Sequence, residues 1–361
     1  MKYYIIAGEP SGDLHGSKLI KEILKLDKKA KIRFWGGDLM KKNGGEIVMH
    51  YKNLAFMGFS EVFANIFKIL KNFKLCKKDI LNFNPDKIIY IDYPGFNLRI
   101  CKWAKKKKFK NYFYIAPQVW AWKEKRSEII KKYIDQLYVV LPFEKDYFTT
   151  KHNIKANFFG HPLMDDLKKF QLKKIECKKP IISILPGSRK QEISKILNEI
   201  LNICKYYPDF KFIIAGVKHV GEETYNKIIT KKNCNVEVIY NRTYDIISSS
   251  KLSIVTSGTA TLETALLNTP QIVCYKSSNL NILLAKFFVK VKFISLVNLV
   301  CNKEVIKELI QNDVNELNLK NEINSIINGK SEKIKKDYLI LNRLIGSHGV
   351  SKKVASHIIK N

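Results

Sequence analysis

Asp92 is the residue of this chain that the sequence places best to act as a base. It ends an apolar run, residues 86–92, and a Tyr-Pro-Gly turn follows. Open α/β sheets bind their ligands at the C-terminal ends of their strands, where a partly desolvated carboxylate can take a proton from a hydroxyl group. Asn97 follows the turn and could orient this carboxylate or bind substrate. An Asp that only stabilises the turn is the alternative interpretation.

A glycine-containing loop, GEPSGD at residues 8–13, follows the first apolar run and opens a helical pattern. Free backbone amides at a helix N-terminus attract anions and sugar oxygens. The residues expected to bind substrate there are Glu9, Ser11, Gly12 and Asp13. A tight turn with Asp13 as the helix N-cap explains the same residues without a ligand.

Two loops in the second half of the chain have features of phosphate-binding sites. One carries Gly187 and Ser188 before Arg189, so backbone N–H groups and the guanidinium could hold a diphosphate. The other offers hydroxyl groups and a glycine before a helix, with an acid that could accept hydrogen bonds from ribose. Its expected ligand-binding residues are Ser257, Gly258, Thr259 and Glu263. Each loop could be a simple helix cap, but two together favour a nucleotide diphosphate.

The aromatic and histidine residues give weaker evidence for a binding site. Trp120 and Trp122 lie in the loop at residues 116–122, where indole rings stack on sugars or, more commonly, pack in the core. The seven His show no metal-ligand spacing such as HExxH. No metal or other cofactor is therefore expected.

Short apolar runs that alternate with helical patterns must position these loops. They resemble strands buried on both faces of parallel sheets, which predicts an α/β fold of two Rossmann-like domains facing across a cleft that holds the ligands. The predicted domains are residues 1–165 and 175–340, with 341–361 as a final helix that could pack back on the first. The runs are 3–8, 31–37, 86–92, 111–117, 136–142 and 157–162, then 180–189, 210–216, 236–240, 252–258 and 271–277.

Residues 56–75 combine bulky apolar groups at three- and four-residue spacing with interleaved lysines. That pattern is typical of a helix lying in a membrane interface, and a core-facing amphipathic helix is the alternative. Residues 283–293 have the same ambiguity. The expected membrane contacts are Phe59, Val62, Phe63, Ile66, Phe67, Lys68, Leu70 and Lys71.

The net charge of +31, from 64 Lys and Arg against 33 Asp and Glu, favours anionic partners. An anionic membrane surface, an anionic substrate or nucleic acid would fit, and so would compositional drift, because Lys is abundant throughout. No nucleic-acid-binding module is recognisable, so nucleic acid is not expected. No run of about 18 uncharged apolar residues occurs, which predicts peripheral rather than spanning membrane association.

Seven motifs follow one another along the chain, namely GEPSGD, DYPGFN, PQVWAW, LPFE, GHP, LPGSR and SGTATLE. Their order resembles that in the lipid-A-disaccharide synthases, from about residue 3 to 345. That resemblance implies a GT-B fold and an inverting transfer in the biosynthesis of lipid A, the anchor of lipopolysaccharide. The donor would be UDP-2,3-diacylglucosamine and the acceptor 2,3-diacylglucosamine 1-phosphate, giving a β-1,6 disaccharide 1-phosphate and UDP.

The resemblance also implies residue roles and a location. The first-half loops with Asp92 would handle the acceptor and proton transfer, and Arg189 with the Ser257 loop would hold UDP without a metal. The expected location is cytoplasmic, on the inner face of the cytoplasmic membrane. One departure is visible: Pro10 stands where the family often has Ala, so this position has no amide to donate. A UDP-sugar 2-epimerase shares the fold, and a non-catalytic basic membrane- or RNA-binding protein is a further alternative.

Overall fold

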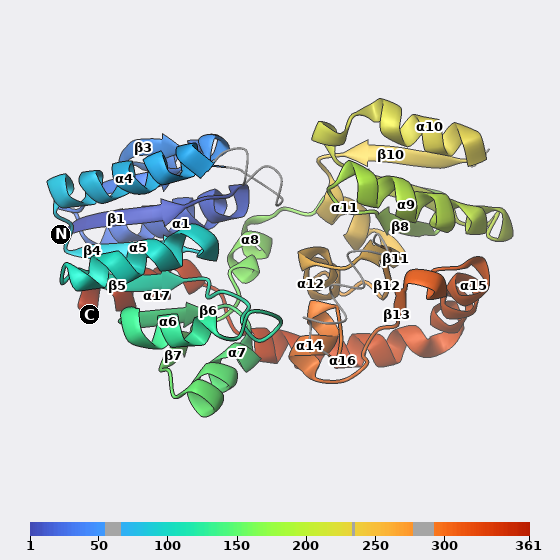
Figure 1. The fold of residues 1–361 in the computed structure, drawn as a ribbon. Coiled ribbons are helices and arrows are strands. Elements are labelled where there is room, and N and C mark those ends of the chain that lie inside the picture. Colours follow the sequence, from blue (N-terminus) through green and yellow to red (C-terminus); the bar gives the residue numbers. More distant parts are fainter. Residues whose placement is uncertain (55–65, 233–234, 277–291) are drawn as a thin grey trace. The chain divides into compact units, whose positions relative to one another are not determined.

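A computed structural model of the 361-residue chain describes residues 1–54, 66–232, 235–276 and 292–361 (Figure 1). Two compact units are present, one of residues 1–169 with 346–361 and the other of residues 170–345. Each contains a parallel sheet with helices between its strands. The predicted α/β class with two Rossmann-like domains is confirmed.

The first unit is built on a seven-stranded sheet in the order β3-β2-β1-β4-β5-β6-β7. The order reverses between β1 and β4, which pair in parallel with Ala7 opposite Ile91. Loops that leave two such neighbouring strands diverge and create a ligand crevice. The strands are β1 (Lys2–Ala7), β2 (Lys31–Gly36), β3 (Glu46–His50), β4 (Lys87–Ile91), β5 (Lys110–Tyr114), β6 (Gln136–Val139) and β7 (Ala156–Phe158).

Helices cover both faces of this sheet because alternate strand residues point to opposite sides. Tyr3 and Ile5 lie in one core cluster with residues of α1 and α17, while Tyr4 and Ile6 lie in another with residues of α4, α5 and α6. The helices of this unit are α1 (Pro10–Leu26), α2 (Asp38–Asn43), α4 (Ile66–Phe83), α5 (Pro94–Lys106), α6 (Arg126–Tyr133), α7 (Pro142–Asp146), α8 (Leu163–Lys169) and α17 (Val350–Lys360).

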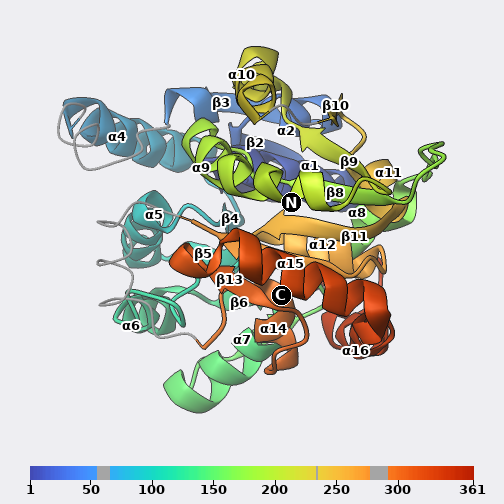
Figure 2. The same ribbon diagram turned by 90° about the vertical axis from the view of Figure 1, so that its right-hand side faces the viewer.

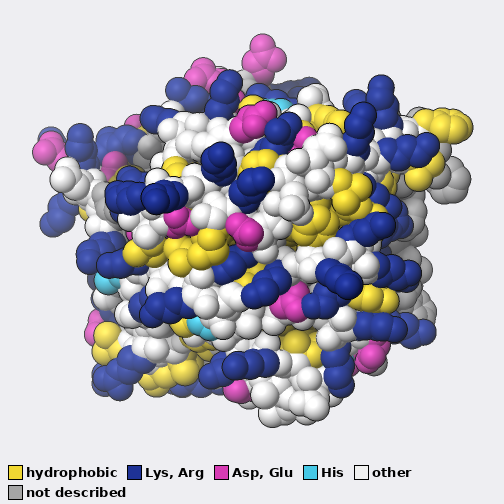
Figure 3. All heavy atoms as spheres, turned by 90° about the vertical axis from the view of Figure 1, so that its left-hand side faces the viewer, with side chains coloured by type: hydrophobic (Ala, Val, Ile, Leu, Met, Phe, Trp, Pro, Cys, Tyr) yellow, Lys and Arg dark blue, Asp and Glu magenta, His cyan; other side chains and the backbone are white. Residues whose placement is uncertain are grey.

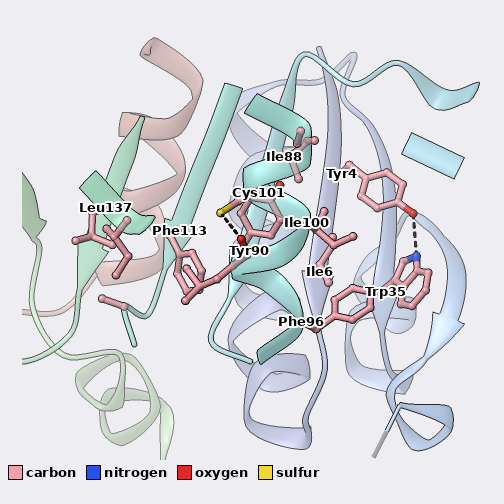
Figure 4. Close-up of a cluster of buried hydrophobic side chains, with 14 of the residues drawn as sticks. Tyr4, Ile6, Trp35, Ile88, Tyr90, Phe96, Ile100, Cys101, Phe113 and Leu137 are labelled. Carbon is pink, nitrogen blue, oxygen red and sulfur yellow. Dashed lines mark hydrogen bonds between the residues drawn. The ribbon is translucent and has the colours of Figure 1, made fainter. Parts of the chain in front are cut away.

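Buried aromatic rings anchor the start of α5, the helix that follows Asp92 (Figure 4). Phe96 stacks on Trp35 with 5.5 Å between ring centroids. The Trp35 indole N–H donates to the Tyr4 hydroxyl at 2.8 Å, so the polar atoms of this cluster are paired although they are buried. The turn between β4 and α5 is thus fixed from the core side.

The second unit has a six-stranded sheet in the order β10-β9-β8-β11-β12-β13. Its order reverses between β8 and β11, where Leu185 lies opposite Val255. The strands are β8 (Ile181–Leu185), β9 (Lys211–Gly216), β10 (Val236–Tyr240), β11 (Ser250–Thr256), β12 (Gln271–Tyr275) and β13 (Glu308–Ile310).

Helices α9 and α10 lie beside the β8–β10 half of this sheet, and α14 to α16 lie beside β12 and β13 (Figures 1 and 2). The helices of this unit are α9 (Lys190–Ile200), α10 (Glu222–Lys232), α11 (Thr243–Ser248), α12 (Thr259–Leu266), α14 (Leu296–Cys301), α15 (Glu316–Ser325) and α16 (Ser331–Ile345). No helix of the described ranges is long and apolar enough to cross a membrane.

The C-terminal tail differs from the single helix predicted for residues 341–361. Helix α16 ends at Ile345 and α17 begins at Val350. Between them Gly346 and Gly349 have φ of +90° and +80°, left-handed conformations that break a helix and that glycine adopts at little cost. Helix α17 belongs to the first unit, where Val354 lies in the same cluster as residues of α1. The edge strands β3 and β13 were not predicted.

Candidate active site

Asp92 lies where the strand order of the first unit reverses, directly after β4. Its backbone and that of Tyr93 are left-handed, with φ of +46° and +48°. The Asp92 N–H donates to the Tyr114 carbonyl at 3.2 Å, and the Asn97 side-chain amide donates to the Asp92 carbonyl at 2.7 Å. Non-glycine residues adopt such conformations only where their surroundings enforce them, which is frequent at functional sites.

The Asp92 carboxyl group has a raised pKa of about 6. Burial is the main cause, and the negative charge of Glu9, which follows the end of β1, adds to it. A carboxylate with this pKa is mostly ionised at neutral pH and is a stronger proton acceptor than an ordinary Asp. The structure therefore gives Asp92 the property that a base requires.

The other residues of the first loop divide into accessible and buried ones. Glu9 is the N-cap residue of α1 and is half-buried, and Ser11 is exposed. Gly12 is buried against β1, where an added Cβ would lie 3.1 Å from the Ala7 side chain. Only Glu9 and Ser11 thus offer side chains to a ligand.

Asp13 is buried, and the structure supports neither its predicted contact with substrate nor the alternative that it is the N-cap of its own helix, α1. Its carboxylate accepts hydrogen bonds from the backbone N–H groups of Gly37, Leu39 and Met40, at 2.8, 3.1 and 3.0 Å. It therefore caps α2, a helix other than its own. With these three donors Asp13 is occupied inside the protein and has little surface for a substrate.

Asn97 is fully buried. Its amide donates only to backbone carbonyls, those of Asp92, Ile6 and Ile91 among the described residues. It has no exposed surface with which to contact a substrate. Asn97 instead holds the backbone of Asp92, whereas the sequence suggested that it orients the Asp92 carboxylate or binds substrate.

A pocket of about 290 Å³ opens beside Asp92. Its wall contains three residues that the sequence did not assign to the site, namely Trp122, Arg126 and Glu144. The Trp122 side chain is 47% exposed, so it is not the core residue that loop tryptophans commonly become. The full lining is Asp92, Pro94, Ile115, Ala116, Pro117, Gln118, Val119, Trp122, Arg126, Val140 and Glu144.

Glu144 is a second carboxyl group of this pocket and is fully buried. Its oxygens accept hydrogen bonds from the Trp120 indole at 2.9 Å and from the backbone N–H groups of Val140 and Leu141 at 3.1 and 3.0 Å. Burial raises its pKa to about 7 in spite of these donors, and the charge of Asp92 contributes. An acid three residues after the N-cap of a helix is a sequence signal for this reach back to the backbone.

In the second unit, the turn after β8 leads into α9. Gly187 has a φ of +100°, and the Ser188 carbonyl accepts a hydrogen bond from His219 Nε2 at 2.9 Å. Arg189 is the N-cap residue of α9, and Ser188 and Arg189 are exposed. The free amides at the start of this helix and the guanidinium group are the features that bind a diphosphate.

The loop after β11 lies next to the turn after β8, because β8 and β11 are paired. Gly258, with a φ of +134°, is the N-cap residue of α12, and Thr259 is exposed. The Ser257 hydroxyl donates to a backbone carbonyl 3.0 Å away, and Glu263 accepts from the Tyr244 hydroxyl at 2.9 Å. The second unit thus brings both predicted phosphate loops to the reversal point of its sheet, while the Asp92 loops meet at that of the first.

Within the described ranges, no group of three or more His, Cys, Asp or Glu could hold a metal ion.

The predicted membrane helix is described only from residue 66. Phe59, Val62 and Phe63 lie outside the described residues, as does the side chain of Ile66. On α4, Phe67 and Leu70 are 85% and 52% exposed, and Lys68 and Lys71 are exposed beside them. Figure 3 shows Lys and Arg spread over one face of the molecule among scattered apolar side chains.

Known proteins resemble this chain along nearly its whole length. The family model described as lipid-A-disaccharide synthetase matches residues 3–359. Lipid-A-disaccharide synthase 1 of Legionella pneumophila strain Paris is 35% identical, covering 87% of this chain and 85% of the relative. The Geobacter sulfurreducens lipid-A-disaccharide synthase is 31% identical over 99% of this chain and 96% of its own length.

Solved structures show the same fold at low identity. The Neisseria meningitidis UDP-GlcNAc 2-epimerase bound to UDP-GlcNAc has a TM-score of 0.69 at 15% identity, with both chains fully covered. The glycosyltransferase of kitacinnamycin has a TM-score of 0.68 at 12% identity, covering 99% of this chain and 98% of its own. The fold is shared by epimerases and transferases, whereas the family model and both sequence relatives above are lipid-A-disaccharide synthases. This chain belongs to the lipid-A-disaccharide synthase family, whose members are GT-B glycosyltransferases that form the lipid A disaccharide.

Proposed function

We propose that this enzyme joins UDP-2,3-diacylglucosamine to 2,3-diacylglucosamine 1-phosphate, giving the β-1,6 disaccharide 1-phosphate and UDP. The observation that carries the residue roles is the partly buried Asp92, with its raised pKa of about 6, beside a pocket in the first unit. The acceptor sugar binds in this pocket. The donor nucleotide binds at the two loops of the second unit.

Asp92 acts as the base. It takes the proton of the acceptor 6-hydroxyl as the oxygen attacks the anomeric carbon of the donor, so no unstable alkoxide forms. The new bond forms opposite the bond to UDP, whose electron pair leaves with the diphosphate. One direct displacement inverts the anomeric carbon and needs no covalent sugar–enzyme intermediate.

The second unit stabilises the leaving group. Arg189 and the amides at the start of α9 compensate the negative charge that grows on the diphosphate. Ser257, Gly258 and Thr259 hold the nucleotide from the neighbouring strand end, and Glu263 binds ribose hydroxyl groups with the carboxylate that Tyr244 orients. These groups supply positive charge and donors without a metal, so we expect turnover to persist in EDTA.

The enzyme reaches its lipid substrates from the inner face of the cytoplasmic membrane. Support comes from α4, where Phe67 and Leu70 are largely exposed next to lysines. Apolar side chains flanked by cations insert at the interface of anionic bilayers. The net charge of +31 adds a long-range attraction to the same surface.

The test uses the purified enzyme with both sugar lipids in nonionic detergent micelles. We expect UDP and disaccharide in equal amounts from the wild type. Asp92→Asn should abolish turnover while UDP binding, measured by calorimetry, stays intact, and the exposed Asp146→Asn serves as the matched control. Unchanged activity of Asp92→Asn would remove this residue from the base role. Conversion of UDP-GlcNAc without an acceptor would instead identify a 2-epimerase.

A further inference from the structure

Arg126 lines the same pocket as Asp92 and begins α6. Its side chain is half-buried, so the guanidinium group is partly desolvated. The proposed base and this cation thus belong to one pocket.

Two more cations lie around Arg126. The guanidinium of Arg126 lies 5.5 Å and the Lys123 ammonium 4.3 Å from the centroid of the Trp122 ring. Burial lowers the pKa of Arg126, and the charge of Arg99 lowers it further. The pKa of Lys123 is lowered by burial and then by the charge of Arg126. Arg126 is therefore repelled by both Arg99 and Lys123.

Nothing described in the structure neutralises this cluster. No ion pair within 4.0 Å joins a described residue to Arg99, Lys123 or Arg126. The carboxyl groups of the pocket, Asp92 and Glu144, both have raised pKa values, so Arg126 does not compensate their charge. Like charges held together without a counter-ion are costly, and the aromatic faces of Trp122 and Phe73 relieve that cost only in part.

We infer that Arg126, supported by Arg99 and Lys123, binds the phosphate group of the acceptor sugar lipid. A phosphate monoester carries close to two negative charges, and a guanidinium can bind it with two parallel hydrogen bonds. The pocket would then hold the acceptor at both ends, with its phosphate at the cations and its attacking hydroxyl at Asp92. Trp122, which is 47% exposed and lines the same pocket, offers apolar surface to the sugar ring between them.

This inference rests on the proposed function, and its experiment compares two acceptors. One is 2,3-diacylglucosamine 1-phosphate and the other is the same lipid without the phosphate, both in nonionic micelles free of anionic lipid. The dephosphorylated lipid is measured as a substrate or, where turnover is too slow, by its inhibition constant. Variants are Arg126→Ala, Arg126→Lys and the neighbouring exposed Lys125→Ala, which removes a positive charge outside the pocket lining.

We expect Arg126→Ala to lower kcat/KM for the phosphorylated acceptor by about 10- to 100-fold, the usual effect of losing a charged hydrogen-bond partner. Its behaviour toward the dephosphorylated lipid should match the wild type, which also shows that the variant is folded. Arg126→Lys should be intermediate, because an ammonium lacks the planar fork. Lys125→Ala should leave both acceptors unaffected.

Equal losses on the two acceptors would overturn the inference, since Arg126 would then not recognise phosphate. Discrimination that appeared only on vesicles of anionic phospholipid would also overturn it, because the cluster would then bind membrane headgroups. Failure of the wild type to form disaccharide from either acceptor is a different result. It would refute the proposed function, and the inference with it.

Discussion

The Asn97 side-chain amide donates to the backbone carbonyl of Asp92 across 2.7 Å. The same nitrogen lies 3.4 Å from the carbonyl oxygens of Ile6 and Ile91, at the ends of β1 and β4. Asp92 itself has a φ of +46°, a conformation that costs a non-glycine residue about 1–3 kcal/mol. One buried amide thus ties the proposed base to the two strands between which the sheet order reverses.

Asn97→Ala should therefore disturb both stability and catalysis. Loss of the buried amide leaves carbonyl groups without this donor, which should lower the free energy of unfolding by about 1–3 kcal/mol. Release of the strained turn should also lower kcat and shift the acid limb of the pH profile of kcat/KM. Both effects are measured by denaturant unfolding and by initial rates across pH.

The matched control is Asn111→Ala. Asn111 is also fully buried in the first unit, and its amide donates to the carbonyls of Cys101 and Tyr133 at 2.9 and 2.8 Å. We expect a similar stability loss with an unchanged pH profile. If the two variants had the same kinetics, Asn97 would be a structural residue only.

The pKa of Asp92 predicts how the activity depends on pH. A protonated carboxyl group cannot accept the proton of the acceptor, so kcat/KM should rise with pH around an apparent pKa of about 6. Glu9→Gln removes a negative charge that raises this pKa, so the rise should move to lower pH. Glu128→Gln, an exposed change of the same kind on α6, should leave the profile in place. A shift to higher pH in Glu9→Gln would contradict this electrostatic assignment.

Glu144→Gln tests the buried carboxyl group of the pocket. The Gln amide offers one acceptor oxygen, whereas Glu144 presents two oxygens to its three donors. The change should cost about 1–3 kcal/mol of stability near pH 4.5. Burial raises the pKa of Glu144 from 4.5 to about 7. Glu144 therefore makes the wild type less stable as the pH rises from about 4.5 through 7, because the unfolded chain ionises this group while the folded protein still keeps it protonated.

The variant lacks this titration, so its stability deficit should shrink over the same pH range. Unfolding free energies of both proteins between pH 4.5 and 8 measure this change. Glu128→Gln controls for the loss of a carboxylate at an exposed position. A deficit that grew with pH would show that Glu144 is stabilised as the charged form.

Much of this architecture could be predicted from the sequence, because buried parallel strands are short apolar runs and turns follow their C-terminal ends. The predicted runs 3–8, 86–92, 180–189 and 252–258 overlap strands β1, β4, β8 and β11, which flank the two reversal points. The edge strand β3 escaped prediction because its apolar run, residues 47–49, is only three residues long and a charged residue and a histidine flank it.

The roles of individual polar residues were harder to predict. Asp13 caps a helix that begins at Asp38, a contact made by packing rather than by local sequence. Arg126 and Glu144 enter the Asp92 pocket from segments far along the chain, and neither has a spacing pattern of its own that marks a binding site. Such roles depend on where the fold brings separate segments together.

Arg189 should contribute to nucleotide binding and to the departure of UDP. Loss of a charge-assisted hydrogen bond costs about 1.5–3 kcal/mol, so Arg189→Ala should weaken UDP binding by at least tenfold and also lower kcat. Arg189→Lys should recover part of the affinity as a point charge. Calorimetry with UDP and single-turnover rates separate the two effects. Lys195→Ala, an exposed change on the same helix, should bind UDP as the wild type does. If both variants weakened UDP binding equally, Arg189 would act only through its general positive charge.

The described part of α4 provides the test of membrane association. Phe67 and Leu70 are 85% and 52% exposed, so the double change Phe67→Ser and Leu70→Ser should leave the fold intact. Burial of such side chains in a bilayer stabilises binding by about 1.5–3 kcal/mol each, which predicts at least tenfold weaker binding to anionic vesicles. The control is the double change Leu339→Ser and Ile340→Ser on α16, where the two side chains are 61% and 45% exposed. It should have little effect on vesicle binding. Equal vesicle binding by both double variants in sedimentation assays would mean that charge alone, weakened by salt, holds the enzyme at the surface.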